Sequence, residues 1–295
     1  MRASFCPLHF QLIAPPSFWA AFFIARHNDM KRIAGLSAAL ILLTSGCASG
    51  PPELPYPAFV EVDELPDIFL ASLPGVRAKQ LAGDPMTRRS SNRVDLPPDW
   101  SGTSGGAPGR SLELFVLEGS LSIADIELAR GGYAFLPAGS LGFNLHSADG
   151  ARILYFLNDI DPGAVIRSPI IIDAALLDWE PAADAGVFVK ELRKDPGSGA
   201  RTWLQRVTID ASVAWQSSSA SREGYLMSGA YQHSECLMGE VQTGSYLPGG
   251  YFYRPAHTVN GGPESAAATE ATWLLRETSD GTETTAAGCS AAAMP

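Results

Sequence analysis

The chain carries one sequence pattern twice. The first block reads E-L-F-V-L-E-G at residues 113–119 and E-G-Y-L-M-S-G at 223–229. A Gly-Gly-Tyr block follows each, at 131–138 and at 249–256, with five positions from its second glycine to its proline in both copies. The copies are offset by 110 residues at the first block and by 118 at the second, so the second copy has eight extra residues between its blocks. This duplication predicts two copies of one small β domain, with two equivalent positions for a site.

The composition permits a globular protein and argues against binding to nucleic acid. With 295 residues, 46% of them hydrophobic, the chain can bury one or two ordinary cores. Its net charge is −10, whereas phosphate binding requires clustered lysine and arginine. The densest basic stretch, formed by Arg88, Arg89 and Arg93, lies in a polar segment with the composition of a loop. We therefore expect no nucleic-acid partner.

The N-terminal region has the pattern of an export signal. Met30-Lys31-Arg32 precedes an uncharged apolar run, Ile33–Leu43, and small residues follow this run up to Cys47. A short basic region, an apolar region of about a dozen residues and small residues at a cleavage site are typical of secretory signals. Residues 1–29 do not fit the pattern, so we interpret them as an upstream extension that precedes a native start at Met30.

The end of this signal resembles the lipobox of bacterial lipoproteins. The resemblance implies that residues 30–46 are removed and that Cys47 becomes the first residue, with a diacylglycerol on its sulfur. Several acyl chains together anchor a protein stably in a membrane. Ala48 after the cysteine favours the outer membrane in Gram-negative sorting, which implies an exported lipoprotein at the periplasmic face of that membrane. The alternatives are a plain cleaved signal peptide and an uncleaved anchor.

Two cysteines, Cys236 and Cys289, remain in the part that follows the signal. An oxidising compartment would allow them to pair. Cys289 lies in a tail rich in Ala, Thr and Gly, whose composition predicts disorder. We therefore expect two thiols without a structural disulfide.

Short apolar segments separated by glycine and proline predict an all-β fold. Leu112–Leu117 has the composition of a strand, and alternation of apolar and small polar residues in Ser120–Leu128 predicts the second strand of a hairpin. Strands at this spacing are typical of an antiparallel barrel or sandwich. The expected organisation is a tether at 47–65, a first β domain at 66–165, a second at 166–280 and a disordered tail at 281–295.

The duplicated blocks resemble the two signature blocks of the cupins, which are small jelly-roll β-barrels. The form Gly-Gly-Tyr-Phe-Tyr-Arg-Pro at 249–255 is similar to a bicupin group of unassigned function that is grouped with the ChrR-like cupins. The resemblance covers residues 66–280 and implies two tandem cupin barrels, that is, a bicupin.

The resemblance does not extend to the residues that bind metal in cupins. In that family the first block supplies His-x-His and a glutamate, and the second block supplies a third histidine. Three imidazoles and one carboxylate suit Fe, Mn, Ni or Zn. Here no histidine precedes Glu113 or Glu223 closely, and the third-histidine position holds Gly142 in the first copy and Asn260 in the second. We therefore expect neither a metal nor another cofactor.

The second copy keeps polar and aromatic residues that could form a residual ligand pocket. By analogy with the family, Glu223 faces the barrel interior, where its carboxylate needs a donor such as Arg222 or Arg254. The candidate ligand-binding residues are Trp215, Glu223, Tyr225, Tyr251, His257 and Asn260. The alternatives are an exposed loop position for His257 and core filling by the aromatic side chains. His233 and Cys236 lie in the eight-residue insertion and are interpreted as loop residues, because no second pair of metal ligands accompanies them.

Two functions remain open. The first is a lipid-anchored envelope protein that binds a small molecule, or has a structural role, without catalysing a reaction. The second is an enzyme with hydrolase or isomerase chemistry, in which Glu223, His257 and Asn260 hold a weakly bound divalent ion. Metal content separates these two. A third possibility is partner binding on the barrel exterior, which an exposed apolar patch would indicate. The sequence specifies neither the ligand nor the oligomeric state.

Overall fold

The computed structural model describes residues 54–290 except 88, 106–108, 141, 160, 210 and 212. The predicted upstream extension, the export signal and Cys47 lie outside these residues. The described chain consists of strands, loops and two short 3-10 turns, η1 (Val62–Glu64) and η2 (Ala174–Leu176). In this part of the chain no helix is long and apolar enough to cross a membrane. The all-β prediction is confirmed.

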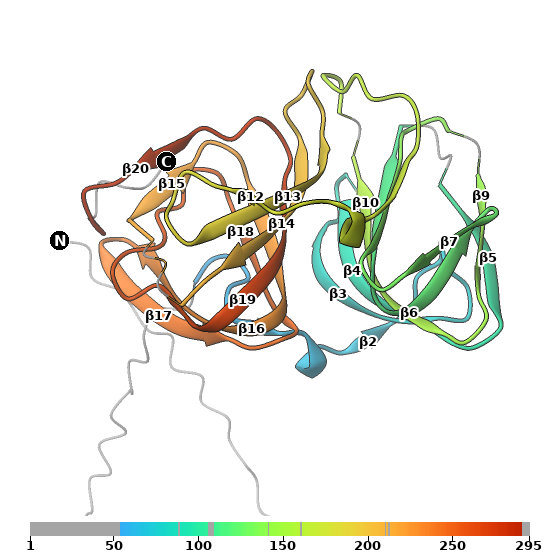
Figure 1. The fold of residues 1–295 in the computed structure, drawn as a ribbon, viewed down its shortest axis with the longest axis horizontal. Helices are drawn as coiled ribbons and strands as arrows, with labels where there is room; N and C mark the ends of the chain where they lie inside the picture. Colours follow the sequence, from blue (N-terminus) through green and yellow to red (C-terminus); the bar gives the residue numbers. More distant parts are fainter. Residues whose placement is uncertain are drawn as a thin grey trace, which may run out of the picture. The chain divides into compact units, whose positions relative to one another are not determined.

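Most strands belong to two antiparallel sheets that lie side by side (Figure 1). The N-terminal sheet has ten strands, seven of them in the order β11-β8-β6-β10-β4-β3-β2, with β5, β7 and β9 joined off this path. Its strands are β2 (Asp67–Ile68), β3 (Arg77–Asp84), β4 (Arg89–Leu96), β5 (Trp100–Ser104), β6 (Ser111–Ile123), β7 (Ile126–Ala129), β8 (Gly132–Leu136), β9 (Phe143–Ser147), β10 (Ala151–Asn158) and β11 (Ile170–Asp173).

The C-terminal sheet has eight strands, in the order β1-β18-β16-β19-β14-β13-β12 with β17 paired to β16. Its strands are β1 (Val60–Glu61), β12 (Glu180–Pro181), β13 (Val187–Lys194), β14 (Arg201–Val207), β16 (Arg222–Leu237), β17 (Glu240–Tyr246), β18 (Gly250–Arg254) and β19 (Ala266–Glu277). Two further strands, β15 (Gln216–Ser218) and β20 (Glu283–Thr285), pair with each other in a small separate sheet.

The chain crosses between the two sheets at positions that differ from the predicted domain boundary at residue 165. Strand β1 precedes the N-terminal sheet in the sequence but pairs with β18, with Val60 opposite Tyr251. Strand β11 lies beyond residue 165 but pairs with β8, with Ile170 opposite Phe135. Each sheet is therefore completed by an edge strand from outside its predicted range, and the chain passes to the C-terminal sheet only after Asp173.

The glycine that ends each first block has a steric role. Gly119 and Gly229 both have positive φ, +72° and +85°. A Cβ atom at Gly119 would lie 2.2 Å from the carbonyl oxygen of Gly150, and one at Gly229 would lie 2.2 Å from that of Glu270. Only glycine tolerates both the conformation and this close approach to the neighbouring strand. The shared spacing therefore reflects the same irregular strand pairing in both copies.

A buried cluster of charged side chains connects the two sheets. Glu113 on β6 is fully buried, and it accepts hydrogen bonds from Tyr133 Oη at 2.9 Å in its own sheet. From the C-terminal sheet it receives Arg193 Nη2 at 3.0 Å and Arg276 Nη2 at 2.9 Å. Thr202 also donates to this carboxylate. Apolar side chains from both sheets surround the cluster and form one shared core.

The equivalent glutamate of the second copy has the same kind of environment. Glu223 accepts a hydrogen bond from Tyr251 Oη at 2.7 Å and forms an ion pair with Arg276. The prediction that Glu223 faces the barrel interior and pairs with Arg222 or Arg254 is therefore wrong. Successive strand residues face opposite sides of a sheet, so Arg222 lies on the inner face of β16 and Glu223 faces the neighbouring sheet.

The charges in the cluster determine the ionisation of its members. Burial alone would raise the pKa of Glu113, but the nearby charges of Arg193 and Arg276 overcome this effect and hold the pKa well below its usual value. Burial and the adjacent Glu113 raise the pKa of Tyr133, so its hydroxyl remains a donor. The contact between the sheets thus rests on an ionised carboxylate shared by two guanidinium groups.

The C-terminal segment is ordered, at least as far as residue 290, in contrast to the predicted disordered tail. Strand β20 pairs with β15, and Ala286 N donates to the carbonyl oxygen of Trp215 at 2.8 Å. Cys289 forms a disulfide with Cys236 on β16. The expectation of two unpaired thiols is wrong, because strand pairing brings a segment of low-complexity composition back to β16. Amino-acid composition alone does not predict pairing between segments that are far apart in the sequence.

We predict that Glu113→Gln lowers the free energy of unfolding by about 3–5 kcal/mol at pH 7, because it leaves the buried Arg193 without a carboxylate and Arg276 with Glu223 alone. Since the pKa of Glu113 is lowered in the folded state, this carboxylate stabilises the fold above the unfolded-state pKa of 4.5 and loses its effect as the pH falls below it. Denaturant titrations between pH 3 and pH 7 measure the difference. The exposed Glu118→Gln on the same strand is the control, and a pH-independent difference would contradict the prediction.

We predict that Cys289→Ser lowers the free energy of unfolding by up to about 4 kcal/mol, because the disulfide closes a loop between residues 53 apart in sequence. Thermal melts with and without a reductant measure the effect. Reduction should destabilise the unaltered protein and leave the variant unchanged. Equal sensitivity of both proteins to the reductant would show that this bond does not stabilise the fold.

Candidate functional site

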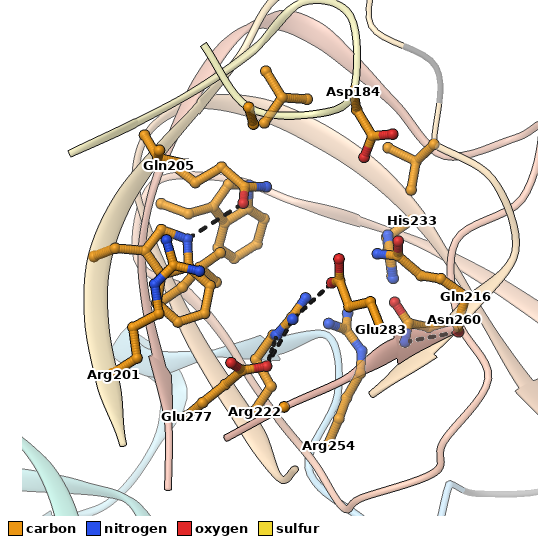
Figure 2. A pocket seen from close by; sticks show the side chains of 18 of the residues that line it. Asp184, Arg201, Gln205, Gln216, Arg222, His233, Arg254, Asn260, Glu277 and Glu283 are labelled. Carbon is orange, nitrogen blue, oxygen red and sulfur yellow. Dashed lines mark hydrogen bonds and ion pairs between the residues drawn. The ribbon is translucent and has the colours of Figure 1, made fainter. Parts of the chain in front are cut away.

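The C-terminal sheet contains a cavity of about 480 Å³ (Figure 2). Strands β13, β14, β16, β18 and β19 form its walls, and the loop after β12 and the segment around β20 contribute further residues. The wall is partly aromatic, with Trp203, Tyr231, Phe252 and Trp273. Its polar lining consists of Asp184, Arg201, Gln205, Gln216, Arg222, His233, Arg254, Asn260, Glu277 and Glu283. The interior of the N-terminal sheet, by contrast, is an apolar core that includes Leu114, Val116 and Tyr155.

One predicted ligand-binding residue, Asn260, lies in this cavity. Asn260 is buried and forms backbone hydrogen bonds in both directions with Gln216, each 2.9 Å long. Its position is the one that holds the third histidine in cupins with a metal. Its role in ligand binding stays a prediction.

The other five predicted residues lie elsewhere. Glu223, Tyr225 and Tyr251 face the shared core between the sheets. His257 is exposed at a position with φ of +66°, which agrees with the alternative of a loop residue. Trp215 is half-buried beside Gly262, where an added Cβ would meet the indole at 2.3 Å. The structure thus does not bring the predicted set together.

Arg222 holds two carboxylates at one side of the cavity. Its guanidinium donates to Glu277 Oε1 from Nε at 3.0 Å and from Nη2 at 2.7 Å. Nη2 also lies 2.7 Å from Glu283 Oε1 on β20 (Figure 2). Glu277 is buried and Glu283 is exposed. The pairing connects the C-terminal segment to the cavity wall.

Arg254 is fixed at the buried side of the cavity by Glu235 and Phe252. Its Nε donates to Glu235 Oε1 at 2.7 Å, and its guanidinium lies 3.6 Å from the centroid of the Phe252 ring. The second oxygen of Glu235 accepts a hydrogen bond from Tyr56 at 3.3 Å. Burial raises the pKa of Glu235, and the charge of Arg254 opposes this shift. These contacts hold the guanidinium in one orientation.

His233 lies beside this pair, and it is 95% buried. Its Nε2 is 3.9 Å from Glu235 Oε1. Among the described residues neither of its ring nitrogens makes a hydrogen bond of normal geometry, although the Asn260 side chain lies close to the ring. Arg254 Nη2 makes none either, although the Tyr246 hydroxyl lies close to this guanidinium. Burial and the charge of Arg254 lower the pKa of His233 well below its usual value, so the imidazole is neutral. Buried polar atoms without partners are rare in folded proteins, and here they belong to two residues that line a cavity.

The interpretation of His233 and Cys236 as loop residues is wrong, because both lie on β16. The eight extra residues of the second copy lengthen the β16–β17 hairpin instead of forming a loop. Tyr231, His233 and Glu235 alternate along this strand, which places them on one face. This period of two was the signal in the sequence that could have identified them.

The cavity does not have the side chains of a cupin metal centre. Within the described ranges no three His, Cys, Asp or Glu side chains are placed to hold a metal ion. Glu277 is occupied by Arg222, and His233 is the single histidine of the cavity lining. Divalent metals are bound by converging imidazoles and free carboxylates. The alternative set of Glu223, His257 and Asn260 does not converge either, since Glu223 lies between the sheets.

Sequence comparison identifies a family without an assigned activity. The family described as a domain of unknown function, DUF4437, matches residues 73–282, which is more than half of the chain. No curated protein matches significantly.

Several solved structures have a similar fold. A provisionally assigned dioxygenase from Nostoc punctiforme is 20% identical with a TM-score of 0.61, covering 77% of this chain and 84% of its own. Protein Ylba from E. coli is 17% identical with a TM-score of 0.58, with coverage of 74% and 89%. Bacillus subtilis oxalate decarboxylase, which has Mn(II) centres, is 10% identical with a TM-score of 0.57, with coverage of 79% and 80%. At these identities the likeness establishes a cupin-like all-β fold and nothing about activity.

Proposed function

The chain belongs to the family of the domain of unknown function DUF4437, and from this premise we propose that it is a tandem cupin that binds a small organic molecule in its C-terminal half. The observation that carries the proposal is the cavity with partnerless polar atoms on Arg254 and His233. Burying such atoms without a partner costs about 1–3 kcal/mol each. A bound polar group would offset this cost.

The remaining wall of the cavity suits an organic ligand. Trp273 makes edge contacts with Phe252 and Tyr231, at 5.5 and 5.8 Å between ring centroids. Ligand sites are commonly apolar and aromatic with a few fixed polar groups. A volume of about 480 Å³ lies in the range of such sites, which hold molecules of metabolite size.

The N-terminal half has a structural role in this proposal. Its interior is filled by apolar side chains, and Arg193 and Arg276 bind its buried Glu113. It therefore supports the strands that carry the cavity. The relationship to oxalate decarboxylase raises the alternative of metal-dependent catalysis, but the three arginine residues around the cavity and the scattered carboxylates favour binding without a metal.

We also propose that the protein is exported and lipid-anchored at Cys47, at the periplasmic face of the outer membrane. The lipobox-like end of the signal supports this proposal, and so does the disulfide between Cys236 and Cys289. Structural disulfides persist in oxidising compartments and are rare in the cytosol.

We predict that Val189→Phe abolishes binding in the cavity, because Val189 lines it and a larger side chain fills the space. A fragment screen by ligand-observed NMR should find molecules that bind the unaltered protein and not this variant. Val241→Phe, at an exposed position of β17 outside the cavity, should retain binding.

The unaltered protein, purified without chelator, should contain well under one equivalent of transition metal. Stoichiometric metal, or a screen without any molecule sensitive to Val189→Phe, would contradict the proposal.

We predict that Cys47→Ser abolishes lipid attachment and releases the protein from the membrane fraction, because the thiol is the acceptor of the diacylglycerol. Metabolic labelling with an alkyne fatty acid in a bacterial host, followed by fractionation, measures both effects. Cys236→Ser is the control and should remain labelled. An unlabelled parent protein would disprove the anchor and leave the ligand-binding proposal intact.

A further inference from the structure

The cavity constrains the chemical class of its ligand, on the premise of the proposed function. We propose that the ligand is uncharged and presents a carbonyl group, as in an amide, urea or lactam, to Arg254 and His233. The flat apolar part of the same molecule lies against the aromatic wall. The proposal follows from three observations: the unused hydrogen-bonding atoms, the charge balance and the shape of the wall.

The unused atoms define the polar group. Arg254 Nη2 can only donate, so its partner must be an acceptor. A neutral imidazole offers one donor and one acceptor, and both nitrogens of His233 are without a partner among the described residues. A carbonyl oxygen satisfies Arg254, and an adjacent N–H satisfies the acceptor nitrogen of His233. An amide combines both atoms in one planar group, which a hydrocarbon or a simple alcohol does not.

The charges argue against an anionic ligand, because each cavity arginine is already paired. Arg254 is paired with Glu235, and Arg201 with Glu191. Arg222 is shared by Glu277 and Glu283. The group formed by these three side chains therefore has one excess negative charge. A ligand carboxylate would add another negative charge without a free cation. Uncompensated charge in a partly buried site is costly.

A cationic ligand is disfavoured by the buried end of the cavity. Arg254 and His233 are the buried groups there, and a cation offers no acceptor to Arg254 Nη2. It would also lie close to a guanidinium that Glu235 and the Phe252 ring hold in place. The exposed carboxylate of Glu283 is already paired with Arg222. An uncharged group therefore fits the buried end best.

The aromatic side chains of the cavity favour a ligand with a flat apolar part. Phe252 and Trp273 meet at an interplanar angle of 62°, and Tyr231 meets Trp273 at 89°. Rings in this arrangement can present both faces and edges to a planar guest. Phe252 also stacks on the Arg254 guanidinium, so the polar end and the apolar wall adjoin. The ligand would thus carry its carbonyl directly on a planar apolar unit.

Three isosteric probes test this proposal: benzamide, benzoate and benzamidinium, which differ mainly in charge. Their dissociation constants are measured on the oxidised, folded protein by tryptophan fluorescence, since Trp203 and Trp273 line the cavity, and by NMR. Benzamide should bind about tenfold more tightly than either ion, a ratio typical of the loss of one hydrogen bond. Benzoate lacks the N–H for His233 and adds a negative charge, and benzamidinium lacks the acceptor for Arg254. Tighter binding of benzoate or of benzamidinium would overturn the proposal. This comparison needs no altered protein.

Arg254→Lys provides a second measurement, because lysine can still pair with Glu235 but lacks Nη2. Benzamide affinity should fall about tenfold, because its carbonyl oxygen loses the donor. Arg206→Lys, on β14 and stacked over Trp179 outside the cavity, is the matched control and should bind as the parent does. Unchanged benzamide binding in a folded Arg254→Lys variant would contradict the assignment. If other fragments bind in a Val189→Phe-sensitive way but benzamide does not, the ligand class is wrong and the proposed function stands. If no molecule binds in a way that Val189→Phe abolishes, the proposed function itself fails.

Discussion

The fold depends on one buried carboxylate, Glu113, that is held by two arginines of the neighbouring sheet. Because this side chain faces the other sheet, its strand neighbours Leu112 and Leu114 must face inward, where they form the core. The same alternation on β16 turns Glu223 outward and Arg222 inward. The ion cluster therefore fixes which face of each strand encloses an interior. A register shift of one residue would turn the charges into the apolar interiors and place the core side chains between the sheets.

The two copies are equivalent in backbone but not in this cluster. Phe156 lies opposite Glu113 on β10, and Arg276 lies opposite Glu223 at the matching position on β19. Only the second copy therefore supplies an arginine from this position. Its guanidinium reaches both glutamates and lies 4.0 Å from the centroid of the Phe156 ring. One phenylalanine and one arginine at equivalent sites pack together, whereas two arginines would repel each other.

Local patterns in the sequence predicted the strands, because alternation and glycine spacing are local properties. The shared glycine of the two blocks, Gly119 in the first and Gly229 in the second, has neighbours that leave no room for a side chain. Asn260, which was predicted by analogy with the cupin motif, lies in the cavity lining. The direction of Glu223 was not, since it depends on a contact with Arg276 and with the other sheet. The Cys236–Cys289 bond was missed for the same reason: sequence composition carries no information about which distant segment a tail pairs with.

The two copies differ most in the segment between their two blocks, where the second copy is eight residues longer. The eight extra residues of the second copy lie between Gly229 and Gly249, and this stretch contains Tyr231, His233 and Glu235. The corresponding strand β6 ends with Leu121 and Ile123 in an apolar core. The longer β16 therefore replaces core residues by a buried polar pair, and its last residues carry Cys236, which binds the C-terminal segment close to the cavity. One hairpin extension thus accounts for the polar groups of the cavity and for the anchorage of the segment beside it. A duplicated fold can open a site in this way without loss of stability, because the first copy and the shared ion cluster continue to hold the sheets together.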